Sequence, residues 1–274
     1  MNARRSGLLL AVLVSLTAAP LTAGDHDPMV APGGIVRWAA PGTTSCTAGG
    51  RTWAPLGDTC FFPVDLLATG RLDLHRTRGD KRETATVQIG PYPYPEQRLT
   101  VPDRMVDLSP QDQARVAREN ARIAPLFEAE ARPGFALPLQ PPLPPGFKGE
   151  RFGSRRLFND QPRSPHNGID YKAPAETPVT AAAGGVVVLA EAHFFAGNSV
   201  FVDHGGGLVS MVFHLARIEV RAGQPVRQGE VIGHVGSSGR ATGPHLHFGV
   251  RWHGARIDPS LLFGPPEHLP LLGP

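Results

Sequence analysis

Residues 243–250 have the sequence Gly-Pro-His-Leu-His-Phe-Gly-Val, and this stretch decides the interpretation of the chain. Gly-Pro marks a turn, and the residues after it alternate as a β-strand does. Side chains two positions apart on a strand share a face, so His245 and His247 point the same way while the apolar residues between and after them face the core. Two imidazoles about 7 Å apart along a strand can serve one site.

A second polar motif precedes it, His-Asn-Gly-Ile-Asp at residues 166–170. Gly168 permits a tight backbone path between a histidine and a carboxylate. Two histidines and one aspartate would leave a fourth zinc position for water, which is typical of catalytic zinc sites, whereas structural sites are closed by four protein ligands. Each motif alone occurs by chance in many proteins, but together they predict a metal site. The chain contains no H-E-x-x-H and no G-x-S-x-G, which excludes a helical zincin site and a serine elbow.

The sequence around these motifs predicts an antiparallel sheet. Apolar runs occur at 186–189, 199–202, 208–215 and 231–235, and Gly205–Gly207 between the second and third predicts a hairpin. Alternation in the 208–215 run places Val209, Met211, Phe213 and Leu215 on the core face and His214 on the opposite face.

The first third of the chain also predicts β-structure. Short apolar runs separated by turn residues occupy 33–101, and Ala85, Val87 and Ile89 alternate as one face of a half-buried strand. We expect a small β-sandwich-like domain over 28–104. The chain has two cysteines, Cys46 and Cys60, which predict a disulfide; free thiols or metal ligands are the alternatives, and no further cysteine exists to complete a cluster.

A connecting segment, residues 105–149, follows this domain. Ser109 and Pro110 are typical of a helix start, and Pro125 must kink or split the helix. Six prolines between 133 and 145 then predict an extended linker. The segment either covers the groove of the following domain and keeps it latent, or is a plain tether.

The N-terminus has the three-part layout of a secretory signal peptide. Arg4 and Arg5 precede the apolar stretch 8–16, and small residues lead to Ala23, so we expect a signal peptide over 1–23 and a protein exported to the periplasm or beyond the cell. No later stretch is long and apolar enough to predict an integral membrane segment in the mature chain.

The remaining composition of the 274 residues fits one or two domains. A net charge of +3 is compatible with attraction to an anionic polymer such as cell wall, or with a plain solvated surface. No run of five or more basic residues exists, and no nucleic-acid partner is predicted.

These motifs carry a resemblance to a known family. Residues 166–171 resemble the HxGxD motif of M23 (LytM/lysostaphin-like) zinc metallopeptidases, and residues 237–248 resemble the second M23 signature, a long turn that ends in HLHF. Residues 212–215 resemble the strand between the two. The match runs over about 150–263 with order and spacing kept. It departs at 211–213, where many members carry a tyrosine before the histidine.

The resemblance implies a mostly β chain with a C-terminal antiparallel M23-type peptidase domain over 150–263 and a tail over 264–274. It implies that His166, Asp170 and His247 bind zinc and that His214 and His245 are an unliganded catalytic pair. One of this pair would accept the proton of a metal-activated water and the other would stabilise the oxyanion.

The implied activity is hydrolysis of peptide bonds in peptidoglycan cross-links or stem peptides. Two alternatives remain. M23-like domains that lack ligands act as regulatory or cell-wall-binding modules, but this chain keeps all five His and Asp positions. A secreted peptidase for other proteins, such as Gly-rich ones, is the other. The sequence predicts no oligomeric state.

Overall fold

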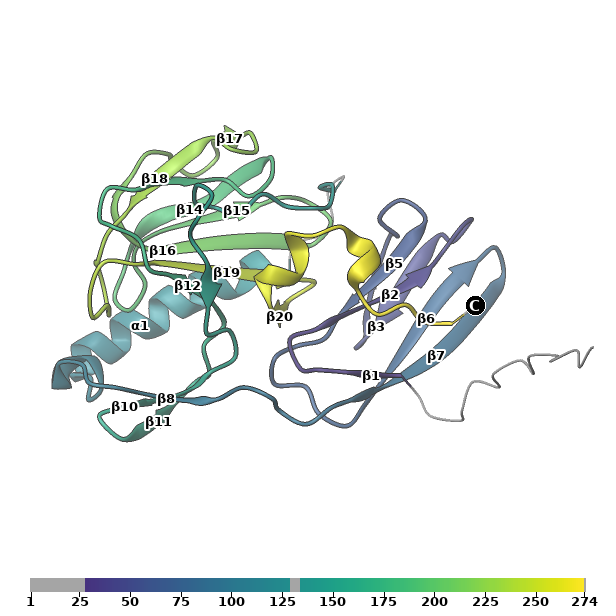
Figure 1. Cartoon of the computed structure of the whole chain (residues 1–274), viewed down its shortest axis with the longest axis horizontal. Helices are drawn as coiled ribbons and strands as arrows, with labels where there is room; N and C mark the ends of the chain where they lie inside the picture. Colours follow the sequence, from purple (N-terminus) through teal and green to yellow (C-terminus); the bar gives the residue numbers. More distant parts are fainter. Residues whose placement is uncertain (1–27, 129–133, 274) are drawn as a thin grey trace, which may run out of the picture.

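The computed structural model describes residues 28–128 and 134–273, and the predicted signal peptide lies outside them. The described residues are mostly strands with a single α-helix, as the sequence predicts. Figure 1 shows two β-rich parts beside each other, with helix α1 (Pro110–Ile123) lying along the second. Over the described residues, no helix has the length and apolar character needed to cross a membrane.

Two sheets build the N-terminal part. Five strands pair in the order β1-β7-β6-β3-β4, and β2 pairs with β5. A core of mainly apolar side chains, with Trp38, Phe62 and Leu74 among them, fills the space between the sheets. The strands are β1 (Met29–Val30), β2 (Ile35–Ala39), β3 (Ser45–Ala48), β4 (Arg51–Trp53), β5 (Thr59–Pro63), β6 (Arg71–Arg78) and β7 (Lys81–Ile89).

The predicted disulfide joins these two sheets. Cys46 lies on β3 and Cys60 on β5, they are bonded, and both are fully buried. A loop of 14 residues closed in this way stabilises the folded state by about 3 kcal/mol in the chain-entropy model.

A small third sheet links the N-terminal part to the rest. Strand β8 (Glu96–Leu99) pairs in parallel with β10 (Arg155–Phe158), and β10 pairs with β11 (Gln161–Arg163). A 3₁₀ helix, η1 (Asp103–Met105), follows β8. Strands from both sides of the connecting segment therefore share a sheet.

An antiparallel sheet forms the C-terminal part, as predicted. Its main path is β17-β14-β15-β16-β19-β12-β9, with β13, β18 and β20 attached to it. Glycines 205–207, all with positive φ, turn the predicted hairpin between β15 and β16. The strands are β9 (Gly149–Glu150), β12 (Gly168–Tyr171), β13 (Pro178–Thr180), β14 (Gly185–His193), β15 (Gly197–Asp203), β16 (Leu208–Ile218), β17 (Pro225–Val226), β18 (Val231–Val235), β19 (Leu246–Trp252) and β20 (Ala255–Ile257).

The predicted core face of β16 is wrong. Val209, Met211 and Phe213 pack together on the face that carries His247, whereas the main core takes Leu208 and Val212 from the opposite face, and Leu215. The register to β15 shifts between Asn198 and Val200, because two residues of β16 bulge opposite one residue of its partner. The bulge changes the phase of the strand at His214.

The Pro-rich segment is extended but packed. Phe135, Leu139 and Leu143 are buried in the main core, and the Leu139 N–H donates to the Leu262 carbonyl. Leu262 lies in η3 (Pro259–Leu262). The segment is thus part of the folded body and not a free tether.

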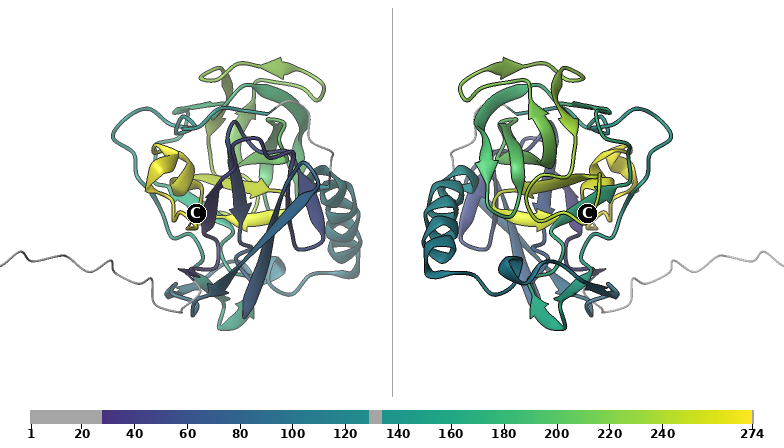
Figure 2. Two further views of the ribbon diagram at one scale, coloured as in Figure 1. Left: turned by 90° about the vertical axis from the view of Figure 1, so that its right-hand side faces the viewer. Right: turned by 90° about the vertical axis from the view of Figure 1, so that its left-hand side faces the viewer.

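The C-terminal residues connect the two parts of the molecule. After η4 (Pro266–His268), Leu269 enters the main core and Leu272 enters the N-terminal core. The Arg37 N–H donates to the Pro270 carbonyl, and the Leu272 N–H donates to the Arg37 carbonyl. Figure 2 shows the C-terminus beside the N-terminal sheets.

Candidate metal centre

Three side chains converge between β12 and β19. Asp170 and His247 face each other across the antiparallel pair, and His166 lies just before β12. The Asp170 Oδ1 atom is 2.9 Å from His166 Nε2 and 3.0 Å from His247 Nδ1, and these two nitrogens are 2.8 Å apart. The predicted ligand residues therefore point their donor atoms at one place.

Hydrogen bonds set the tautomer of His166. Its Nδ1 lies 2.8 Å from the Arg151 carbonyl, which can only accept, so Nδ1 carries the proton. In the neutral ring Nε2 then presents a lone pair to His247 and Asp170. In metal sites, a hydrogen bond from the ring nitrogen that does not bind the metal orients the histidine in this way.

Two glycines make room for the His247 ring. Gly168 and Gly249 are paired across β12 and β19. A Cβ atom on Gly168 would lie 2.4 Å from the Phe248 carbonyl oxygen and 2.7 Å from His247 Nε2. The sequence suggested that this glycine permits a tight backbone path, whereas the structure assigns its need to close packing against β19 and the imidazole.

Electrostatics keep the three groups in the forms that bind metals. Burial by itself would raise the pKa of the Asp170 carboxyl, but the adjacent His166 ring and the hydrogen bond from His247 outweigh burial and hold this pKa well below its ordinary value. The Arg156 Nη2 donates to Asp170 Oδ2 at 3.1 Å. Burial lowers the pKa of His166, and lowers that of His247 to about 4, so both rings are neutral at pH 7.

The donor set fits a metal ion. Two imidazole nitrogens and one carboxylate oxygen are a common zinc ligand set with an open fourth position. Nε2 of His166 and Nδ1 of His247 both face the Asp170 Oδ1 atom, so three potential ligand atoms meet at one point. Within the described residues this is the one group of three such side chains close enough to hold an ion.

The predicted catalytic pair lies beside this cluster. His214 and His245 have ring centroids 4.7 Å apart, and His214 is 6.3 Å from the His247 ring. His214 has a φ of 64°, a left-handed backbone that is uncommon for a residue with a side chain. This conformation and the bulge place His214 on the site side of β16, next to Phe213, which stacks on His247 at 5.0 Å.

Both rings of the pair have defined tautomers. The His214 Nδ1 donates to the Ser238 carbonyl and the His245 Nδ1 donates to the Gly243 carbonyl, each at 2.8 Å. Nε2 of each neutral ring is therefore a proton acceptor. Burial, with added repulsion from His245 and His247, lowers the pKa of His214 to about 3, which makes its neutral form dominant.

A groove runs past these residues. A first hollow of about 230 Å³ is lined by Asp170, His245 and His214, and a second of about 390 Å³ by His247 and His214. The side chains that line both hollows stand where they meet: Arg156, Phe158, His214 and Arg240. Arg240 belongs to the long turn before His245, within the 237–248 stretch that resembles the second M23 signature.

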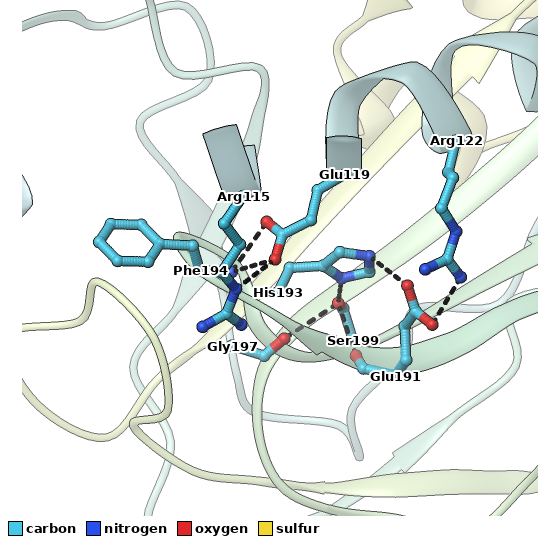
Figure 3. A network of polar contacts seen from close by, with 8 residues as sticks. All are labelled: Arg115, Glu119, Arg122, Glu191, His193, Phe194, Gly197 and Ser199. Carbon is cyan, nitrogen blue, oxygen red and sulfur yellow. Dashed lines mark hydrogen bonds and ion pairs between the residues drawn. The ribbon is translucent and has the colours of Figure 1, made fainter. Parts of the chain in front are cut away.

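Helix α1 covers the second hollow, although no residue of the helix is fully buried. Figure 3 shows the polar network that holds it. Both Glu119 oxygens accept from the Phe194 N–H, at 3.0 and 3.1 Å, and Arg122 pairs with Glu191 at 2.7 Å. His193, which the sequence interpretation left outside the site, lines this hollow and hydrogen-bonds Ser199.

Two further histidines of the C-terminal part lie in other settings. His204 is buried between the Gly184 carbonyl and the Ser210 hydroxyl. His253 stacks on Trp53 at 4.1 Å. These contacts are structural.

Comparison with known proteins extends these observations. The family model described as peptidase family M23 matches residues 164–259. The peptidoglycan DD-endopeptidase ShyA of Vibrio cholerae is 45% identical over 108 residues, which are 39% of this chain and 25% of ShyA. The DD-carboxypeptidase/endopeptidase Mpg of Neisseria meningitidis is 45% identical over 103 residues, 37% of this chain and 24% of Mpg. The chain thus spans about a quarter of the length of these relatives.

Similarity to a solved structure covers far more of the chain. The crystal structure of a peptidase M23 protein from Pseudomonas aeruginosa is 30% identical with a TM-score of 0.69, and the match covers 85% of this chain and 95% of that one. It therefore includes most of the N-terminal part as well as the sheet that carries the site. By sequence and by fold, this chain belongs to peptidase family M23.

Proposed function

We propose that this protein is an exported, zinc-dependent endopeptidase that hydrolyses peptide bonds in peptidoglycan cross-links or stem peptides. The observation that carries the proposal is the convergence of His166 Nε2, His247 Nδ1 and Asp170 Oδ1 within about one hydrogen-bond length of each other. Two further imidazoles with free Nε2 atoms lie beside them, in a groove. The name of ShyA, a peptidoglycan DD-endopeptidase, supports peptidoglycan as the substrate, and the name of Mpg supports endopeptidase activity.

His166, Asp170 and His247 would hold the zinc ion. A zinc ion there supplies Lewis acidity, which polarises a peptide carbonyl and makes water a nucleophile at neutral pH. Arg156 orients the Asp170 carboxylate by donating a hydrogen bond to Oδ2, and the Arg151 carbonyl orients the His166 ring by accepting from Nδ1.

His214 and His245 would move the protons. Because Nδ1 of each ring is committed to a carbonyl, each Nε2 is free to accept a proton from the attacking water. The ring that becomes protonated can then stabilise the developing oxyanion or protonate the departing amine.

The non-catalytic alternative is a regulatory module that binds cell wall without cleaving it. All five His and Asp side chains are present and oriented here, which favours catalysis.

Dye release from labelled, purified peptidoglycan tests the proposal. Mature protein should release dye, a chelator should abolish the release and added zinc should restore it. His245→Ala should be inactive, whereas His268→Ala, which removes an exposed histidine remote from the groove, should match the wild type. Wild-type protein that binds zinc and releases no dye would favour the non-catalytic module.

A further inference from the structure

Cationic side chains outnumber acidic ones in the first hollow of the groove. The charged residues that line it are Glu150, Arg151, Arg156, Asp170, Lys172 and Arg240. Of the two acids, Asp170 belongs to the metal centre. Among the residues that the structure describes, no carboxylate lies within ion-pair distance of Arg151, Lys172 or Arg240.

Arg240 is held in place without an acidic partner. Its guanidinium carbon lies 4.3 Å from the centre of the Phe158 ring and 4.1 Å from that of Phe195. One of its nitrogens donates to the Met105 carbonyl at 3.2 Å. Two aromatic contacts and one hydrogen bond restrict the side chain before any ligand arrives, which lowers the entropy cost of binding.

The charge of Arg240 is costly in this setting. Burial, with added repulsion from Arg156 and Arg163, lowers the pKa of Arg240 to about 10. The group is still charged at pH 7, so a partly buried cation lies near other cations without a carboxylate of its own. An anion that entered the hollow would relieve this repulsion and accept charge-assisted hydrogen bonds.

The position of Arg240 relates such an anion to the reaction. Arg240 lines both hollows, as His214 does, and the first hollow also contains Asp170 and His245. An anionic group held by Arg240 would therefore lie next to the bond to be cut. Arg151 and Lys172 line the first hollow and not the second, so the cationic rim around Arg240 lies on the side of the first hollow.

We propose that Arg240, with Arg151 and Lys172 at the rim, forms a subsite for a free carboxylate of the substrate peptide adjacent to the scissile bond. The proposal rests on the peptidase function proposed above and deepens it. The carboxylate is either the free C-terminus of a stem peptide or the side-chain carboxylate of a residue beside the cleaved bond, and both present the same chemistry to a guanidinium.

A defined cross-linked muropeptide dimer in three forms distinguishes these sources. One form keeps its carboxylates, one is amidated at the C-terminus, and one is amidated at the side chain beside the scissile bond. Amidation of the recognised group should lower kcat/KM of the wild type by about 10- to 100-fold, as expected for a lost hydrogen bond to a charged group, and the other amidation should leave it nearly unchanged.

Variants assign the preference to Arg240. Arg240→Gln should abolish it, so that the acid and amide forms are cleaved at the same reduced rate, and Arg240→Lys should keep part of it. Arg227→Gln, which removes an exposed arginine outside the groove, should keep the full ratio. A ratio of rates is insensitive to the fraction of folded enzyme, so a poorly folding variant does not mimic the expected result.

A wild type that cleaves all three forms equally, or an Arg240→Gln variant that keeps the wild-type ratio, would overturn the subsite and leave the peptidase function intact. A wild type that cleaves none of them would overturn the peptidase function. Calorimetric binding of the acid and amide product peptides to wild type and Arg240→Gln would then still decide the subsite, since equal binding in the wild type would contradict it.

Discussion

Gly168→Ala is the substitution whose effect follows most directly from the structure. The added methyl group would lie 2.4 Å from the Phe248 carbonyl oxygen and 2.7 Å from His247 Nε2. The carbonyl belongs to β19, which pairs with the strand that carries Gly168, so it cannot rotate away as a flexible side chain would. The two strands must separate, and the His247 ring must move.

The size of the effect can be estimated from overpacking elsewhere. Extra methyl groups in well-packed regions destabilise the folded state by about 1–3 kcal/mol. For a protein of this size that lowers Tm by about 2–12 °C. Because His247 is displaced as well, zinc affinity should fall by about 10–100-fold, as for changes in groups that orient metal ligands.

The assay compares thermal melting and chelator-competition zinc titration for the wild type, Gly168→Ala and a matched control. Gly184→Ala is the control, because its methyl group would meet nothing closer than 3.7 Å and the residue is exposed. The control should match the wild type in both measurements. A Gly168→Ala protein with the Tm and zinc affinity of the control would refute the assignment of this glycine to close packing around His247.

Three further substitutions test other contacts. Glu119→Ala removes both acceptors of the Phe194 N–H, so it should lower the free energy of unfolding by about 1–2 kcal/mol. Because it also loosens α1, it should raise the cleavage rate on cross-linked peptidoglycan relative to the rate on a short peptide. An unchanged ratio of the two rates would count against a covering role for the helix. Arg156→Met should weaken zinc binding by about 10–100-fold in chelator competition, whereas an unaltered affinity would show that the arginine does not orient the metal-site carboxylate. Burial tends to raise the pKa of Asp65, but hydrogen bonds from Arg256 outweigh burial and keep this pKa below the ordinary 3.8. The Asp65–Arg256 pair therefore stabilises the folded state by about 1 kcal/mol above the pKa of the unfolded chain. This stabilisation is lost as the pH falls through the lower pKa of the folded state. Asp65→Asn should therefore lower the urea midpoint at pH 7, and the difference from the wild type should shrink only as the pH falls below 3.8 and through the lower folded pKa. A difference that stays constant through this acid range would contradict the assignment.

Local sequence patterns were sufficient for most of the fold. Alternation predicted the strands that carry His247 and Val87, although His245 lies in an isolated bridge just before β19, and the even pair of cysteines predicted the disulfide. The strands depend on neighbours in sequence, and two cysteines can form only one disulfide within the chain. The boundaries proposed for the domains stay predictions, and β8 pairs with β10 across the predicted connecting segment.

The features that the sequence did not predict depend on tertiary contacts. Nothing local marks His214 as a residue with positive φ, so its bulge and the changed phase of Leu215 could not be predicted from alternation. Phe135 and its neighbours are spaced by prolines as in a linker, and only the surrounding core shows that they are buried. Arg240 was overlooked because its aromatic neighbours, Phe158 and Phe195, are distant in sequence.

The covering hypothesis for residues 105–149 also changes form. The sequence allowed either a cover or a plain tether for the whole segment. In the structure α1 and the Pro-rich part differ, because α1 lies over the second hollow while the Pro-rich part fills the main core. A protein shortened to start near residue 147 would lose core side chains, so Glu119→Ala is the cleaner test of a cover.

Cleavage of a defined muropeptide dimer by metal-free and zinc-reloaded protein, followed by mass spectrometry, tests the central claim most directly. We expect the metal-free protein to leave the dimer intact and the zinc-loaded protein to split it into two peptide products that together contain one added water, with the glycan unchanged. An intact dimer after incubation with fully zinc-loaded wild type, or products cut in the glycan, would contradict the assignment of this protein as a peptidoglycan endopeptidase.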